Sequence, residues 1–529
     1  MANPKRQSFL SGAMILTATI VVTKFIGALY KIPLGNLLDS EGMAHFYAAY
    51  NIYRLLLTLS TAGLPLAMSR MVSEAEALGR ENQKHRIFHV ALGLFLVMGA
   101  VSGVGMFVLS APLSRLLHDT LAQTAVKILA PAVFFVCLMS AIRGYTQGQG
   151  NMKPTAASEI IESLSKAVIG YGLAWWLLSR GLPRHIAAAG AIGGVTAGTA
   201  LALIALLLYL AGRKGRRPSH DVPESRRLIL RRLLRIGIPI TAGSCGMSII
   251  TVLDTSLVLG TLQRSLGYSQ EAATALYGQY TYGLNLFTLP PALIAPVTIS
   301  LIPAVSAARA RLDAASARRN MDAAFRFAAL LALPLGAGLC VLSRPLLDLL
   351  YPDIPETAAA AAGHLSVLGI ASIFVCLMTL SGGILQAYGR ERIPLWTLLA
   401  GGLAKIVSNY LLVGDPAIGI RGAAYSTLLC YVLIAVLNLI AVARVVPEHP
   451  DYLEVFTKPL LATAVMAAAA RAGFGLAAQW IPGRAAVLPA ILFAAGVYAA
   501  LVLAMGIIRR QDLAALPKGG KIADLLHLR

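Results

Sequence analysis

Several basic side chains lie within long apolar stretches of the sequence, where a charged group is costly. Lys24 and Lys31 are seven residues apart in the first stretch, which places them on one side of a helix. Arg54 follows in the second stretch and shares a polar stripe with Asn51. Ionisable groups inside membrane spans normally face a bundle interior or a wet cavity. The cations therefore predict a cavity for an anionic ligand, and phosphate suits Arg and Lys donors well.

Further polar residues extend this pattern into later apolar stretches. Lys166 follows Glu162 at the spacing of an ion pair on one helix face. The second half of the chain adds Lys405 and Asn285. We predict that a central cavity binds substrate through Lys24, Arg54, Lys31, Asn51, Lys166, Lys405 and Asn285.

Asp254 is the main isolated carboxylate of the second half. In one interpretation it binds a coupling proton or Na⁺, with Asn409 and Thr427 as further candidates for that ion site. In the other, Asp254 pairs with Lys405 or with Lys24. Both interpretations fit the sequence.

A simpler structural interpretation exists for Lys31, for the Glu162–Lys166 pair, and for the break in the second apolar stretch. Lys31 lies near the end of its predicted helix, where a lysine can extend to the membrane interface. Glu162 and Lys166 can form a purely structural pair. Gly63 and Pro65 interrupt the second stretch, either as a hinge or as a static kink.

The composition indicates a membrane protein. The chain is 57% hydrophobic and 13% charged, with a mean hydropathy of +0.71, whereas soluble domains have about 25% charged residues. A helix needs about 20 mostly apolar residues to cross a bilayer. We predict an all-α membrane protein with about fourteen transmembrane helices, at 9–34, 46–69, 88–110, 121–142, 155–179, 186–210, 234–260, 275–303, 323–343, 358–386, 394–413, 420–443, 456–477 and 485–508.

The net charge of +21 reflects topology, and no nucleic-acid partner is expected. With a cytoplasmic N-terminus, most of the Lys and Arg residues fall in cytoplasmic segments, as the positive-inside rule requires. Both termini are therefore predicted to be cytoplasmic. The first apolar run is too long for a secretory signal and contains Lys24, so it is expected to remain as a helix.

The two halves of the chain resemble each other. Tyr47 recurs 230 residues later as Tyr277, and Lys166 recurs 239 residues later as Lys405. Each repeat covers six helices, so the halves should form two pseudo-symmetric lobes with the substrate path between them. The predicted domains are an N-lobe at 1–212, a basic linker at 213–233, a C-lobe at 234–446, and two helices with a tail at 447–529.

The sequence carries no signature of covalent chemistry. It lacks a GxxxxGK[ST] phosphate loop, and its nine histidines show no metal-ligand spacing. The five cysteines lie in apolar segments, as buried thiols do. The glycine-rich stretch 144–150 is interpreted as a turn between two spans. We expect no cofactor and no enzymatic activity.

Short motifs also resemble a known family. They are Thr-Lys-Phe-Ile-Gly at 23–27, Leu-Ser-Thr-Ala-Gly-Leu-Pro-Leu-Ala at 59–67, Arg-Gly-Tyr-Thr-Gln-Gly at 143–148, Met-Lys-Pro-Thr at 152–155 and Leu-Asp-Thr at 253–255. In them the chain resembles the polysaccharide-biosynthesis branch of the MATE-like multidrug/oligosaccharidyl-lipid/polysaccharide exporter superfamily. It is most similar to stage V sporulation protein B and the MurJ-type lipid II flippases.

The resemblance implies an alternating-access flippase in the bacterial cytoplasmic membrane, surrounded by membrane lipids. Its substrate would be an undecaprenyl-diphosphate-linked saccharide, with lipid II as the expected cargo. The family's basic positions on the first two helices match Lys24 and Arg54. Well-known lipid II flippases also carry a basic residue on the eighth helix, where this chain has Asn285. Lys166 and Lys405 are candidate substitutes for it.

Two other functions stay open. A cation-coupled multidrug exporter of the same fold would need acidic residues to dominate the cavity. A non-transporting scaffold for envelope or spore assembly would tolerate substitution of Lys24 or Arg54.

Overall fold

A computed structural model describes residues 9–61, 63–212, 219–447, 450, 452–481 and 483–507. Every secondary-structure element in these ranges is a helix. Part of the predicted linker (213–218) and the C-terminal tail (508–529) lie outside them. The chain divides into two compact units, Met1–Thr281 and Tyr282–Arg529.

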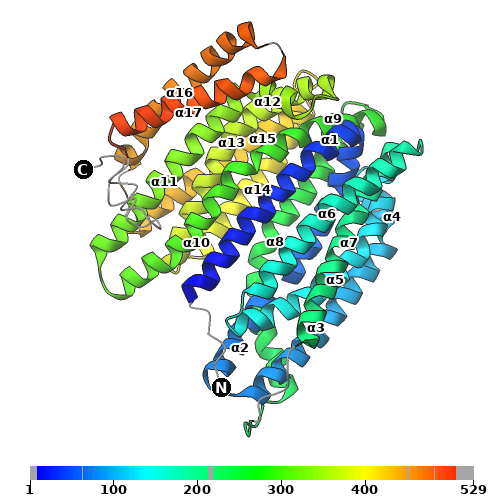
Figure 1. The fold of residues 1–529 in the computed structure, drawn as a ribbon, viewed down its shortest axis with the longest axis vertical. Helices are drawn as coiled ribbons and strands as arrows, with labels where there is room; N and C mark the ends of the chain where they lie inside the picture. Colours follow the sequence, from blue (N-terminus) through cyan, green and yellow to red (C-terminus); the bar gives the residue numbers. More distant parts are fainter. Residues whose placement is uncertain are drawn as a thin grey trace. The chain divides into compact units, whose positions relative to one another are not determined.

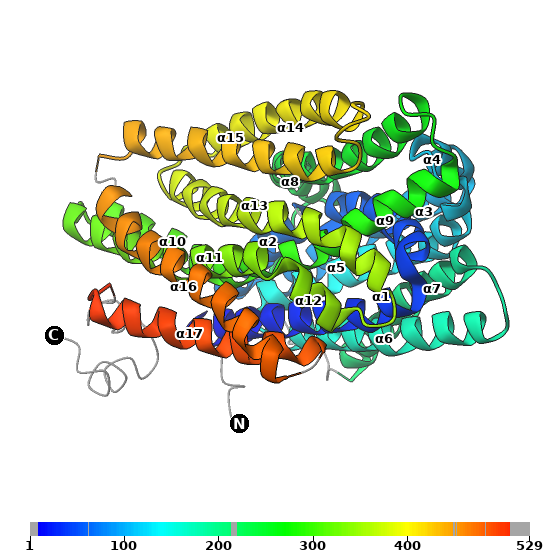
Figure 2. The same ribbon diagram turned by 90° about the horizontal axis from the view of Figure 1, so that it is seen from above.

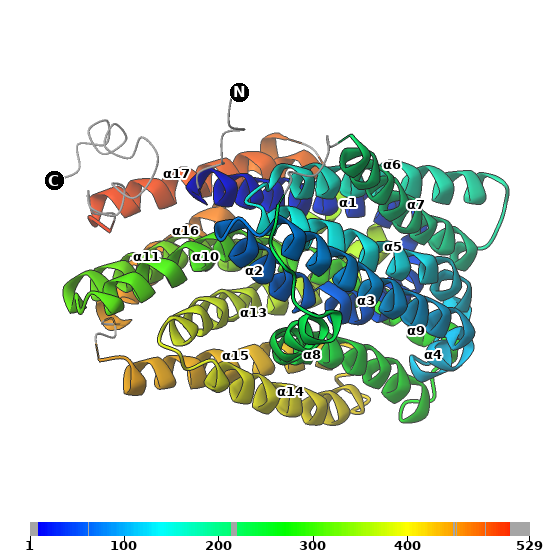
Figure 3. The same cartoon turned by 90° about the horizontal axis from the view of Figure 1, so that it is seen from below.

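Unit 1 is a bundle of long helices (Figures 1 and 3). Within it α6 packs on α7, α3 on α5, and α5 on α7, while α1 contacts α5, α6, α7 and α8. Its elements are α1 (Phe9–Thr61), α2 (Leu64–Ala77), α3 (Glu81–Val108), α4 (Ser110–Leu116), η1 (Thr120–Ala122), α5 (Gln123–Gly148), α6 (Lys153–Ser179), α7 (Arg184–Ala211), α8 (Arg226–Arg264) and most of α9 (Gln270–Phe287).

Unit 2 is also helical. Its core forms where α13 packs against α10, α11 and α15, and α14 lies along α15. The last two helices, α16 and α17, pack side by side (Figure 2). Its elements are α10 (Leu289–Ala310), α11 (Ala314–Val341), α12 (Ser343–Leu350), α13 (Pro355–Ala387), α14 (Arg392–Val413), α15 (Arg421–Val445), α16 (Tyr452–Trp480), η2 (Arg484–Ala486) and α17 (Val487–Ala504).

The predicted class, an all-α membrane protein, is confirmed. Among the described residues, ten helical segments are long and apolar enough to cross a membrane. The first of them, Ala18–Ala77, has 60 residues, contains the predicted window 46–69 and overlaps the predicted window 9–34 from residue 18 onward. The predicted window at 275–303 is divided between α9 and α10 at Thr288. The count of fourteen and the cytoplasmic location of the termini stay predictions.

Helix boundaries recur along the chain, as the internal repeat predicts. The helices α3 and α4 meet at Leu109, and α11 and α12 meet 233 residues later at Leu342. The ends of α5 and α13 also match, because each is followed by a glycine with positive φ, Gly150 at 73° and Gly389 at 69°. The boundaries therefore repeat although most side chains differ.

The glycine-rich stretch 144–150 was predicted to be a turn, and this is wrong for most of it. The helix α5 continues through Gly148. An added Cβ would lie 2.9 Å from the Pro65 carbonyl oxygen at Gly144, and 2.6 Å from the Ser69 carbonyl oxygen at Gly148. These glycines therefore let α5 approach the backbone of α2, and only the residues after Gly148 turn.

The predicted interruption at Gly63 and Pro65 is present. The helix α1 ends at Thr61, and Pro65 lies in the first turn of α2, where its missing N–H is not needed. The Gly63 N–H donates to the Thr241 hydroxyl of α8 at 3.2 Å. The break between α1 and α2 is thus hydrogen-bonded to a third helix, α8.

Glycines at four-residue spacing on α7 let α6 lie unusually close. A Cβ on Gly194 would lie 2.3 Å from the Cα of Gly170, and one on Gly198 would lie 2.8 Å from the Glu162 carbonyl oxygen. Small residues at this spacing allow two membrane helices to pack backbone to backbone. The contact fixes the part of α6 that carries Lys166.

We predict that Gly194→Ala destabilises the protein. The new methyl group would collide with the backbone of α6, and overpacking of this kind costs about 1–3 kcal/mol. The measurement is the thermal unfolding midpoint of the purified protein in detergent. Gly172→Ala on α6 is the control, because no atom lies within 4 Å of its added Cβ. Equal midpoints for the two variants would contradict the proposed packing.

Candidate functional site

A bend at Asp39 brings the predicted cations of the first two spans together. Asp39 has a φ of 57° and a ψ of −173°, and it interrupts α1. The ammonium group of Lys31 lies 5.1 Å from the ring centroid of Tyr47. These two residues lie equally far from Asp39 along the chain, so the two halves of α1 pack as antiparallel helices.

Four cations of unit 1 form one electrostatic cluster. The charge of Lys24 is repelled by those of Arg54 and Lys166, and the charge of Lys31 is repelled by all three. Lys24 and Arg54 are exposed, whereas Lys31 and Lys166 are half-buried. We call Lys24, Lys31, Arg54 and Lys166 the cation cluster. The sequence named all four, but only the fold shows that they interact.

Tyrosine rings line the cation cluster, and sequence reasoning did not assign them to the site. The ammonium group of Lys166 lies 5.7 Å from the ring centroid of Tyr50, and Lys24, Arg54 and Lys166 all act on Tyr50 electrostatically. An aromatic face attracts a cation through its quadrupole. The repeat of Tyr47 and Tyr50 at Tyr277 and Tyr280 was the available signal.

The carboxylate predicted to pair with Lys166 binds a different cation. Glu162 accepts a hydrogen bond from the Arg143 guanidinium at 3.1 Å, and Arg143 also donates to the Ser158 hydroxyl at 2.9 Å. Arg143 opens the Arg-Gly-Tyr-Thr-Gln-Gly motif at the end of α5. This pairing occupies Glu162, while the Lys166 ammonium group contacts the Tyr50 ring.

Asn51 has a positioning role next to the cluster. It is 6% exposed, and its amide donates to the Thr255 hydroxyl on α8 at 3.0 Å. Thr255 also lies 2.9 Å from the Tyr277 hydroxyl of α9. The neighbouring Asp254, the predicted coupling residue, is buried at 6% exposure. The polar chain ties the second half of α1 to α8 and α9.

The remaining predicted residues lie in unit 2 and are all buried. Lys405 and Asn409 occupy α14, and the Asn409 side chain accepts a hydrogen bond from Ser426 of α15. Thr427 follows on α15 at 1% exposure. Asn285 lies beside Tyr351. Their roles in binding substrate or a coupling ion stay predictions.

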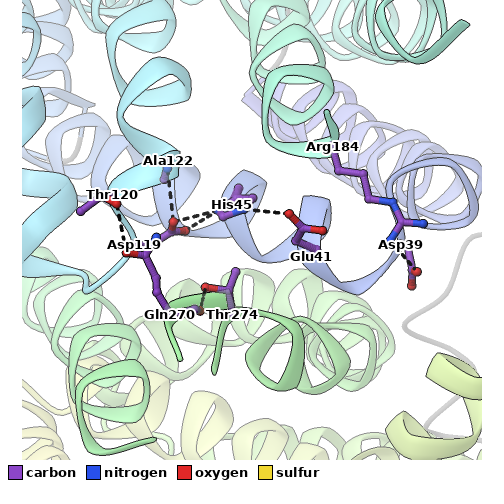
Figure 4. A network of polar contacts seen from close by, with 9 residues as sticks. All are labelled: Asp39, Glu41, His45, Asp119, Thr120, Ala122, Arg184, Gln270 and Thr274. Carbon is purple, nitrogen blue, oxygen red and sulfur yellow. Dashed lines mark hydrogen bonds and ion pairs between the residues drawn. The ribbon is translucent and has the colours of Figure 1, made fainter. Parts of the chain in front are cut away.

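A second polar network lies in unit 1 beyond the bend (Figure 4). The His45 Nδ1 lies 2.8 and 2.7 Å from the two carboxylate oxygens of Asp119, and both side chains are almost completely buried. The His45 Nε2 lies 3.9 Å from Glu41. Nearby, Arg184 of α7 pairs with Asp39 at 3.0 Å. The network joins the start of α1's second half to the loop before η1.

We predict that Asp119→Ala strongly destabilises unit 1. Removing one partner of a buried ion pair costs about 3–5 kcal/mol, because the other charge stays buried without compensation. Arg184→Ala breaks the more exposed pair with Asp39, and surface pairs contribute about 0–1 kcal/mol. Thermal unfolding in detergent compares the two variants. A smaller loss for Asp119→Ala than for Arg184→Ala would refute a stabilising role for the buried pair.

The described residues contain no group of three His, Cys, Asp or Glu side chains placed to hold a metal ion. The five cysteines are free, and four of them are buried, while Cys340 is half-buried. The polar chemistry of unit 1 is therefore that of a cationic surface with aromatic neighbours, which can hold an anion by charge and hydrogen bonds.

Comparisons with known sequences identify a family and several relatives. The sequence model of the family described as polysaccharide biosynthesis protein matches residues 9–308. Stage V sporulation protein B of Bacillus subtilis (strain 168) is 25% identical over 98% of this chain and 99% of its own length. Lipid II flippase MurJ of the same organism is 23% identical over 90% of this chain and 89% of its own length.

Solved structures share the fold. Lipid II flippase MurJ in an inward closed conformation superposes with a TM-score of 0.69 at 14% identity, covering 94% of this chain and 98% of that one. An inward-facing multidrug resistance MATE family transporter of the MOP superfamily gives a TM-score of 0.67 at 14% identity, covering 82% and 98%. These likenesses concern the fold alone.

Proposed function

The chain belongs to the polysaccharide biosynthesis protein family, and from this premise we propose that it is a flippase for a lipid-linked saccharide. The substrate class is an undecaprenyl-diphosphate-linked saccharide, and lipid II is the cargo that we expect. The protein moves the headgroup across the cytoplasmic membrane by alternating access and makes or breaks no covalent bond.

The cation cluster is the observation that carries the proposal. It gathers four positive side chains in segments that the sequence places within the membrane, and Glu162, four residues before Lys166 on α6, is engaged by Arg143. A diphosphate supplies the opposite charge, and its oxygens accept hydrogen bonds from guanidinium and ammonium groups. A relative named lipid II flippase MurJ supports the same substrate class.

In the proposed mechanism, the diphosphate neutralises the repulsion within the cation cluster while the prenyl chain stays in lipid. The rings of Tyr47 and Tyr50 hold Lys31 and Lys166 in place through cation–π contacts. Movement of the two predicted lobes then exposes the site to the other side. Release is driven by the membrane potential or by an ion that returns to Asp254.

A multidrug exporter is the second candidate, because the MATE transporters share the fold. Such an exporter takes up cationic drugs and needs carboxylates at its binding site. Four mutually repelling cations would repel that cargo, so the charge of unit 1 favours the flippase.

We predict that the chain rescues growth of a bacterium depleted of its lipid II flippase. Lys24→Ala and Arg54→Ala should each lower flipping by about 10- to 100-fold, because a hydrogen bond to a charged group contributes about 1.5–3 kcal/mol. The measurement is colony formation at matched membrane levels of each variant. Lys127→Ala is the control, since Lys127 is an exposed cation of α5 outside the cluster.

The results of this experiment distinguish a role of the cation cluster, the identity of the cargo, and the exporter alternative. Rescue by the wild type and by all three variants would contradict the role of the cation cluster. A wild type that inserts but does not rescue would exclude lipid II as the cargo and favour another lipid-linked glycan. Resistance to cationic dyes that is unaffected by Lys24→Ala would support the exporter.

A further inference from the structure

Unit 1 contains a cavity that is separate from the cation cluster. It lies between the start of α3 and the start of α8, and its volume is about 960 Å³. The basic residues His85, Arg86, His89, Arg226 and Arg227 line it, and no Asp or Glu is among the described residues of its wall. The positive charge of Arg86, Arg226 and Arg227 favours an anion in this cavity.

The segment that precedes α8 contributes Pro223 to the cavity lining and is held against the start of α3. The Asp221 carboxylate accepts hydrogen bonds from the backbone N–H groups of Asn82 and Gln83, at 3.0 and 2.8 Å. Burial opposes the charge of this carboxylate, but its hydrogen bonds from Ser219 and the backbone lower the pKa of Asp221 below its usual value. The N-terminus of α3 is thus already capped, and the cavity beside it is a separate feature.

Arg86 fixes the position of the same segment. One of its guanidinium nitrogens donates to the carbonyl oxygens of Pro223 and Glu224, each at 3.3 Å. The Glu224 N–H donates in turn to the Gln83 side chain at 2.7 Å. Arg226 and Arg227 follow directly and are exposed. The segment therefore holds two free-standing arginines over the start of α3.

The cavity is polar at one end and apolar at the other. Along α3 its lining changes from His85 and His89 to Val90, Leu94 and Val97. The helix α3 is a candidate membrane span that begins at Glu81, so the basic end lies at the membrane boundary and the apolar end lies deeper. A ligand with a charged headgroup and an apolar chain matches this change from basic to apolar lining.

We propose that this cavity is a binding site for an acidic phospholipid, with the phosphate on Arg226 and Arg227 and an acyl chain along Val90, Leu94 and Val97. Basic pockets between membrane helices bind anionic headgroups of the cytoplasmic leaflet in this manner. A soluble phosphate ester would leave the apolar end unfilled, and a zwitterionic lipid would lack the net charge. The inference does not depend on the flippase proposal.

The test is native mass spectrometry of the purified full-length protein with dioleoyl-phosphatidylglycerol or dioleoyl-phosphatidylcholine added. We expect the wild type to retain the phosphatidylglycerol preferentially. Arg226→Gln/Arg227→Gln should weaken that retention by roughly tenfold or more, since each basic residue near an anionic lipid contributes measurably to binding. Leu94→Gln/Val97→Gln should weaken it as well, whereas a purely ionic contact would not respond.

Arg231→Gln/Arg235→Gln is the matched control. It removes two exposed arginines of the same helix that do not line the cavity, so charge and helix are matched. Equal losses in the two arginine pairs would overturn the site in favour of general attraction by a basic helix. Displacement of the lipid by millimolar glycerol phosphate would overturn the lipid as occupant. Equal retention of both lipids would overturn the charge selectivity.

Discussion

Repulsion among like charges within the membrane is the constraint on which unit 1 depends. The bend at Asp39 folds α1 back on itself and sets Lys24 and Lys31 against Arg54. The α6 helix adds Lys166 rather than a free carboxylate. Each such charge is expensive in hydrocarbon, so the arrangement is favourable only where an anion or water meets it. The rest of the bundle holds this strained group of charges in place.

Two kinds of contact hold the cation cluster in place. Glycines on α7 allow α6 to approach within backbone contact, which sets the depth and rotation of Lys166. Polar ties then connect helices that apolar packing alone would leave free to slide. The hydrogen bond from Asn51 to Thr255 and the buried pair of His45 with Asp119 are of this kind. Both anchor the second half of α1, the half that carries Arg54.

Unit 1 contains two separate groups of basic side chains. The cation cluster has aromatic neighbours, whereas the cavity of α3 and α8 combines arginines with an apolar strip. Arginines near headgroups remain hydrated, so they attract lipid at little desolvation cost.

The sequence by itself determined the all-α membrane class and the identities of the four cations, because hydropathy and charge are properties of residues and their spacing. Only the tertiary structure decided which polar side chains interact with one another. Glu162 pairs with Arg143 although Lys166 stands at the ideal local spacing, and the glycine-rich stretch stays helical because α2 packs against it. His45 and Asp119 are 74 residues apart and carry no joint signal. Pairing across helices depends on packing, which local spacing does not encode.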